Sequence, residues 1–260
     1  MTVVFGAIAP HGDPAFVEGS PTRLGFEELA RRLERADPDV TVVVTPHNVH
    51  VSGAFAVVTA ATVAGSLDDP PVELECVVDR PLASRALAEL REARLAAVGV
   101  SYGSNDEKLA VLPMDWGTLI PLWFLGARDA EPRPVVMVCP ARDLSLADHV
   151  RAGEAIARAC VGRRAAVVAS ADHGHAHDPE GPFGFHPAAA EYDERVVELV
   201  RENRLPDVVE LESIVEAASA DSLWQLAVLR GALGDGFDAE LLSYDRPTYF
   251  GMLCASFEPA

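Results

Sequence analysis

The sequence predicts one α/β domain over residues 1–260, with a largely parallel or mixed central sheet and helices on both faces. Short runs of β-branched residues alternate with longer amphipathic patterns, as in chains whose strands are joined by helices. Hydrophobic residues make up 49% of the 260 positions, which is ample for a large core. Neither an internal repeat nor a low-complexity tract nor a linker divides the sequence, so a single domain is expected.

Five short segments rich in β-branched residues are expected to form buried strands, because each is too short for a globular helix. These segments are residues 3–8, 40–45, 96–100, 135–139 and 165–169. Two segments rich in turn-forming residues are expected to be loops, at residues 68–71 and 178–187. The second loop is long enough to cover or line a site.

The clearest helical pattern begins at Ser20, which is the expected N-cap, with Pro21 in the first helical position. Leu24, Leu29 and Leu33 follow as its apolar residues. Further helices are expected at residues 82–95, 144–161, 187–203, 208–218 and 222–233. Sheets of this kind bind ligands beyond the carboxyl ends of their strands.

The chain is strongly acidic, with 21 Lys and Arg against 40 Asp and Glu and a formal charge of −19. Such a surface repels phosphate backbones and anionic lipid headgroups, so nucleic acid and membranes are poor partners. No uninterrupted apolar stretch reaches the roughly 18 to 20 residues of a membrane helix. The four cysteines are scattered without a CxxC pair, and the first residues lack the basic start of a secretory leader, so a reducing cytoplasm is expected.

Seven of the eight histidines lie in three short segments, each just after a predicted strand. They are His11, then His47 and His50, then His173, His175, His177 and His186. The remaining His149 lies within a predicted helix, where a packing role is expected. Because the ends of parallel strands meet at one edge of a sheet, the placement favours a shared site, and imidazole is the commonest metal ligand.

The two Pro-His turns, Pro10-His11 and Pro46-His47, are expected to direct imidazoles from two strands toward one crevice. With a carboxylate they would form a two-histidine, one-carboxylate site, which suits Fe(II) that binds both a substrate and dioxygen. Zinc is the alternative, because residues 173–178 superficially resemble the HxHxDH signature of metallo-β-lactamase-like hydrolases, although the order of Asp and His differs. The sequence holds no GxSxG turn, Walker A loop or strand-borne GxGxxG fingerprint.

Residues 169–175, followed by residues 181–187 and 191–193, resemble the LigB superfamily, the class III extradiol ring-cleavage dioxygenases. That family has an ASxDxxH strand end, a GPxG turn and a helix that opens with Glu, an aromatic residue and Asp. His11 and His47 also follow the first two predicted strands, as the family pattern requires. The resemblance covers nearly the whole chain.

The resemblance implies that Fe(II) is held by His11, His47 and a carboxylate near the start of the last predicted helix, where Asp221 aligns best. It also implies a catalytic histidine at His175, with His177 two residues away as the competing alignment. Zinc in place of iron stays open. The implied partners are a small catechol-type aromatic diol and dioxygen, and a homo-oligomer is expected.

Two positions depart from the family pattern. Trp116 stands where many members carry a histidine in a DHGxxxPL segment that lines the substrate, so the choice of substrate is open. The usual carboxylate ligand of the family is Glu, whereas the aligned residue is Asp221. Glu216 is the alternative ligand, and an N-cap is the alternative role of Asp221.

The resemblance implies extradiol cleavage of a catechol-type ring by dioxygen on Fe(II), with His175 as the group that takes and returns a proton. The neighbouring His173 and His177 are expected to disfavour extra positive charge and so to lower at least one histidine pKa, while Asp172 could orient an imidazolium. Two other functions stay open. One is a Memo-like metal-binding protein of the same fold without oxygenase activity, and the other is a zinc-dependent hydrolase.

Overall fold

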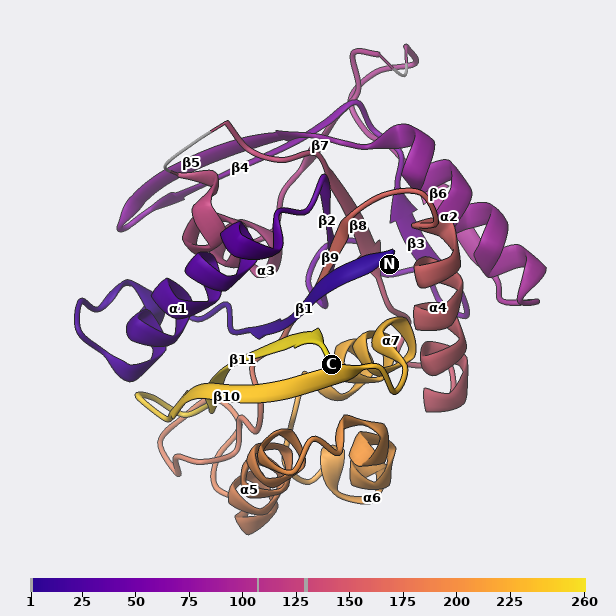
Figure 1. Cartoon of the computed structure of the whole chain (residues 1–260). Helices are drawn as coiled ribbons and strands as arrows, with labels where there is room; N and C mark the ends of the chain where they lie inside the picture. The colour runs from indigo at the N-terminus through magenta and orange to yellow at the C-terminus, as the bar shows by residue number, and fades with distance from the viewer. Residues whose placement is uncertain (1, 107, 129–130) are drawn as a thin grey trace.

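The computed structural model describes residues 2–106, 108–128 and 131–260, which form one α/β domain (Figure 1). The main sheet has eight strands, in the spatial order β10 (Phe237–Asp245), β11 (Met252–Pro259), β1 (Val3–Ala9), β9 (Ala165–Ser170), β2 (Val40–Val44), β8 (Val135–Cys139), β3 (Phe55–Val58) and β6 (Ala97–Val100). A smaller sheet has three strands, in the order β5 (Pro71–Val77), β4 (Thr62–Asp68) and β7 (Val111–Pro113).

The α-helices of the described chain are α1 (Pro21–Ala36), α2 (Arg80–Glu92), α3 (Trp116–Leu122), α4 (Leu146–Ala159), α5 (Pro187–Arg201), α6 (Glu212–Val215) and α7 (Leu223–Leu233). Short turns of other helix types are η1 (Asp13–Phe16), η2 (Trp123–Ala127) and η3 (Leu205–Leu211). Helices α1 and α3 lie on one face of the main sheet, and α2, α4 and α7 cover the other (Figure 1). Among the described residues, no helix is both long and apolar enough to cross a membrane.

The main sheet is mixed, and its centre is parallel. Strands β1, β9, β2 and β8 run parallel to their neighbours in this group, whereas β11 is antiparallel to β1 and β3 is antiparallel to β8. Every residue of these four central strands is buried, because helices cover both faces. Burial on both faces explains their continuous apolar sequences, and the predicted fold class is confirmed.

The five predicted strands are confirmed to within one residue at each end, as β1, β2, β6, β8 and β9. The other three strands of the main sheet, β3, β10 and β11, were not predicted. The start of α1 is also as expected, because the Ser20 hydroxyl accepts a hydrogen bond of 3.1 Å from the backbone N–H of Arg23. Leu29 and Leu33 are buried in the core, but Leu24 is largely exposed and does not belong to the apolar face.

The predicted helix at residues 208–218 is wrong. The chain instead forms the 3₁₀ turn η3 and then the single helical turn α6. Leu205, Val208 and Leu211 are all buried, and their three-residue spacing matches the 3₁₀ period rather than the α-helical one.

The carboxyl ends of β1, β9 and β2 meet at one edge of the main sheet. Strand β9 lies between the other two, with Ser170 beside Ala9 of β1 and Ala169 beside Val44 of β2. The segments that follow these strands carry His11, His47 and the histidine-rich stretch at residues 173–177. Parallel pairing therefore brings three distant parts of the sequence to the same place.

Candidate metal centre and its cavity

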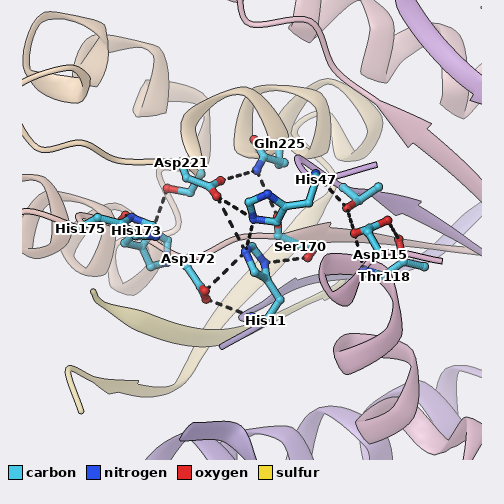
Figure 2. A network of polar contacts seen from close by, with 12 residues as sticks. His11, His47, Asp115, Thr118, Ser170, Asp172, His173, His175, Asp221 and Gln225 are labelled. Carbon is cyan, nitrogen blue, oxygen red and sulfur yellow. Dashed lines mark hydrogen bonds and ion pairs between the residues drawn. The ribbon is translucent and has the colours of Figure 1, made fainter. Parts of the chain in front are cut away.

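Three side chains converge at this edge of the sheet: His11, His47 and Asp221 (Figure 2). The Nε2 atoms of the two imidazoles are 2.9 Å apart. One carboxylate oxygen of Asp221, Oδ2, lies 3.2 Å from Nε2 of His47 and 3.8 Å from Nε2 of His11. The described residues contain this single group of three histidine, cysteine or acidic side chains whose ligand atoms all lie within 4.8 Å of one another.

His11 is held by the end of the neighbouring strand. Its Nδ1 lies 2.9 Å from the hydroxyl oxygen of Ser170, the last residue of β9, and its backbone N–H donates to Asp172 at 3.0 Å. A proton on Nδ1 donated to Ser170 leaves the Nε2 lone pair directed toward His47 and Asp221. Burial lowers the pKa of His11 to about 3, so its ring is neutral and able to bind a metal.

His47 is fixed through the segment that connects β2 to the following loop. The Thr45 hydroxyl donates to Oδ1 of Asp115 at 2.6 Å, and the Asn48 amide donates to Oδ2 at 3.0 Å. Asp115 also caps α3, since its Oδ1 accepts a hydrogen bond from the backbone N–H of Thr118. The His47 ring stacks on Trp116, with ring centroids 4.5 Å apart and 27° between the planes.

Asp221 lies just before α7, whose N-cap position is Ser222. Its role is therefore not that of the N-cap, and its Oδ1 accepts a hydrogen bond of 3.0 Å from the Gln225 side chain. The guanidinium of Arg142 is 3.4 Å from the same oxygen. Glu216, the alternative ligand, is exposed at the end of α6 and does not reach the cluster.

The electrostatic state of the cluster suits a cation. Burial alone would raise the pKa of Asp221, but the hydrogen bond from His47 and the nearby His11 and Arg142 side chains outweigh it, so the pKa lies well below its usual range. Asp172 behaves in the opposite way, because burial raises its pKa well above the ordinary value. The centre therefore combines an ionised Asp221 with a neutral His11.

The donor set fits a metal ion. Ligand atoms that bind one metal at about 2.1 Å and at right angles lie about 3 Å apart, close to two of the three observed separations, 2.9 and 3.2 Å, while the third is 3.8 Å. Two imidazoles and one carboxylate on one side of the centre leave other coordination positions open, as non-haem Fe(II) sites do. The same set is also compatible with zinc.

A cavity of about 550 Å³ opens over the three side chains. Its aromatic walls are Trp116, Phe183, Tyr249 and Phe250. Its polar lining consists of His11, His47, Asp221, His175, Arg142, Asp172, Asp13 and Ser219. The cavity thus combines aromatic walls with a larger set of polar groups gathered around the three candidate ligands.

His175 lines this cavity, in the segment that follows β9. Its Nδ1 is 2.7 Å from the carbonyl oxygen of His173. Because a carbonyl oxygen only accepts, Nδ1 carries the proton, and the Nε2 of the neutral ring is free to act as a base. The ring stacks on Phe250 at 5.3 Å, and burial lowers its pKa.

His177 is placed differently from His175. It is buried outside the cavity lining, with Nε2 2.9 Å from Asp193 and Nδ1 3.1 Å from the Arg246 guanidinium. Both ring nitrogens therefore already have partners within the protein.

The other histidines have structural contacts. His173 is fully buried with Nδ1 3.0 Å from the Ser222 hydroxyl, and burial lowers its pKa to about 4. The His186 ring caps α5 by accepting from the backbone N–H of Ala188. His50 lies at the surface beside Ser52, and His149 is buried within α4, as expected for a packing role.

Several cavity residues were not predicted from the sequence. Arg142 follows the end of β8, so the strand-end argument used for the histidines could have found it. Tyr249 and Phe250 lie between β10 and β11, a hairpin that was not predicted, and no local signal marks them. Phe183 belongs to the predicted loop at residues 178–187, which does line the site.

Comparison with known proteins decides the family. The family model described as the catalytic LigB subunit of aromatic ring-opening dioxygenase matches residues 8–253. This chain belongs to the LigB family. The LigB match confirms the resemblance recognised in the sequence.

Two proteins of other organisms are similar to this chain. Protein CA_C1420 of Clostridium acetobutylicum is 25% identical over 231 residues, which are 86% of this chain and 49% of that protein, so the chain spans about half the length of this curated relative. The crystal structure of the uncharacterized protein JW3007 from Escherichia coli K12 superposes with a TM-score of 0.69, covering 97% of this chain and 99% of that one. At 16% identity, this similarity shows a shared fold alone.

Proposed function

We propose that this LigB-family protein cleaves the ring of a small catechol-type diol by extradiol oxygenation, with Fe(II) held by His11, His47 and Asp221. One observation carries the proposal: the two imidazoles and the carboxylate lie in the same cavity as His175, whose base nitrogen is free. The family match and the aromatic cavity walls support it.

The iron would supply the redox chemistry, because it can bind both oxygens of a diol together with dioxygen and let electrons pass from the ring to dioxygen. The rest of the site would orient the substrate. Trp116, Tyr249 and Phe250 offer faces and edges against which an aromatic ring can pack.

His175 would act as the general base. The carbonyl of His173 fixes the proton on Nδ1, so Nε2 can remove the proton of a diol hydroxyl and later return it. Its lowered pKa keeps the ring in the neutral, proton-accepting form at neutral pH. His177 lacks a free ring nitrogen, which favours His175 for this task.

Oxygen consumption tests the proposal directly. The protein is loaded anaerobically with Fe(II) and mixed with a panel of catechols, and an oxygen electrode and a spectrophotometer follow the reaction. We expect stoichiometric uptake of one dioxygen per diol and a yellow ring-fission product. The same panel with zinc-loaded protein is the matched control.

Two outcomes would support other functions. Hydrolysis of esters or amides by the zinc form without oxygen uptake would assign the site to metal-dependent hydrolysis. Tight metal binding without either reaction would assign the protein to the non-oxygenase members of the fold. Each of these results would contradict ring cleavage.

A further inference from the structure

A buried carboxylate, Asp193 on α5, makes three hydrogen bonds next to the cavity but does not line it. Its Oδ1 accepts from the backbone N–H of Gly174 at 2.7 Å. Its Oδ2 accepts from Nε2–H of His177 at 2.9 Å and from the Tyr244 hydroxyl at 2.8 Å. The carboxylate is 1% exposed, so these three donors replace its hydration.

Asp193 binds residues on both sides of His175 in the sequence. Gly174 precedes it and His177 follows two residues later, so one carboxylate fixes the backbone before the catalytic candidate and the side chain after it. Gly174 also lies close to α5, because a Cβ atom there would be 2.8 Å from the carbonyl oxygen of Ala189. The segment therefore has little freedom to shift.

The same carboxylate connects to the opposite wall of the cavity. Arg246, at the start of the loop between β10 and β11, donates to Nδ1 of His177, which in turn donates to Asp193. Gly251, at the end of that loop, donates its N–H to the Gly174 carbonyl at 3.1 Å, and its carbonyl accepts from His173 at 2.9 Å. This loop carries Tyr249 and Phe250, the rings that contact His175.

The Asp193 carboxylate therefore lies between the segment that carries His175 and the loop that carries Tyr249 and Phe250. Burial, together with the adjacent Asp193 charge, raises the pKa of Tyr244, so this hydroxyl stays protonated and donates. A Cβ at position 251 would lie 2.0 Å from Oδ2 of Asp193, so the loop backbone packs directly on the carboxylate. None of these groups touches His11, His47 or Asp221 through a recorded hydrogen bond or ion pair.

We propose that Asp193, through Gly174, His177 and Tyr244, is a positioning residue that holds His175 and the Tyr249–Phe250 wall in their working orientation. The proposal rests on the proposed function, in which His175 moves the proton. In this proposal, His177 helps to position His175 and does not itself transfer a proton. No hydrogen bond or ion pair joins Asp193, His177 or Tyr244 directly to His11, His47 or Asp221.

A double-mutant cycle tests this role. Asp193→Asn keeps an acceptor for Gly174 but turns an N–H₂ group toward the donors of His177 and Tyr244. We expect kcat for the diol to fall by up to about 100-fold, the cost of a small misplacement of a reacting group, with KM and iron content little changed. In a His175→Ala background the same substitution should cause no further loss, since the group that it positions is absent.

Tyr244→Phe is the milder companion variant, because it removes one hydrogen bond without placing a new donor against the carboxylate. It should lower kcat several-fold in the same His175-dependent manner. Equal losses from Asp193→Asn with and without His175 would overturn the proposal, since a general structural role predicts additivity. Loss of iron from either variant would also overturn it.

A spectroscopic measurement separates this proposal from the proposed function. Nitrogen-15 NMR of the zinc-loaded protein reports which ring nitrogen of His175 carries the proton, without any turnover. We expect one fixed Nδ1–H form in the parent protein and an averaged signal in Asp193→Asn and Tyr244→Phe. An unchanged fixed signal in both variants contradicts positioning, whereas absence of diol turnover with the expected NMR change contradicts only the ring-cleavage function.

Discussion

The imidazoles of His11 and His47 meet edge to face, with Nε2 atoms 2.9 Å apart and ring planes at 85°, although β1 and β2 do not pair with each other. Strand β9 separates the two strands and supplies Ser170, which orients the His11 ring. Two ring nitrogens this close share either a proton, as in a hydrogen bond, or a cation. The same spacing allows the two nitrogens to bind one metal ion.

Metal binding should depend on His11 and His47 together. We expect the His11→Ala, His47→Ala double variant to fold, because both residues follow strands and do not build the core, yet to bind no iron after anaerobic loading. Elemental analysis after desalting measures the iron content, and circular dichroism checks the fold. Full iron stoichiometry in this variant would show that the metal lies elsewhere.

Asp221 should be the third ligand. Asp221→Asn keeps the size of the side chain and an acceptor for Gln225, but removes the anionic charge. We expect the affinity for iron to fall by more than about 100-fold, since even the loss of a residue behind a ligand costs about 10–100-fold. The exposed Glu216→Gln is the matched control and should retain parent affinity; the reverse pattern would make Glu216 the ligand.

Arg142 should weaken metal binding, because its guanidinium lies 3.4 Å from Asp221 Oδ1 and repels a cation placed on that carboxylate. We expect Arg142→Gln to tighten metal binding several-fold, measured by competition with a chelator at constant ionic strength. Arg142→Lys keeps the charge and should stay close to the parent protein. Weaker binding in Arg142→Gln would mean that Arg142 chiefly holds Asp221 in place.

His175 and His177 should give different kinetic losses. We expect His175→Ala to retain iron and bind the diol, while kcat falls by the roughly 10²–10⁴-fold typical of a lost general base. His177→Gln removes the link between Arg246 and Asp193 and should cost less. Steady-state kinetics with metal analysis decides between them, and a larger loss in His177→Gln would reverse the assignment.

His149 should make the protein less stable in mild acid. Burial lowers its pKa in the folded chain, so below about pH 6.5 the unfolded chain takes up a proton that the folded chain does not. Stability is therefore lost as the pH falls, by at most about 1.4 kcal/mol per pH unit from this residue. Urea unfolding of His149→Leu from pH 7.5 to 5.0 should show a shallower slope than the parent; equal slopes would exclude this contribution.

Local sequence patterns predicted the centre of the fold but not its margins. The all-buried strands β1, β2, β8 and β9 stand out because any residue that points to either face must be apolar. Strand β5 alternates strictly between exposed and buried residues, a period-2 pattern that local sequence does contain, although this strand was not predicted. Strand β10 is only partly buried, and its pairing with β11 depends on contacts that local sequence does not record.

The candidate site, like the fold, could be predicted from local sequence only in part. His11 and His47 could be predicted because each comes directly after a strand whose position was clear. The choice between His175 and His177 could not, since both are histidines in one short segment and differ only in their tertiary partners. Asp193 belongs to the motif at residues 191–193, but its contacts with Tyr244 and Gly174 bring together residues from three distant segments.

The three candidate ligands come from distant parts of the sequence, and this has a thermodynamic consequence. The three candidate ligands are at positions 11, 47 and 221, so an unfolded chain cannot hold them together and binds the ion only weakly. Ligation is then linked to the folding equilibrium, and a metal present at 100 times its dissociation constant adds about 2.7 kcal/mol to stability. The midpoint of thermal denaturation should accordingly rise with free metal concentration, which turns a melting curve into a binding isotherm even when no substrate is known.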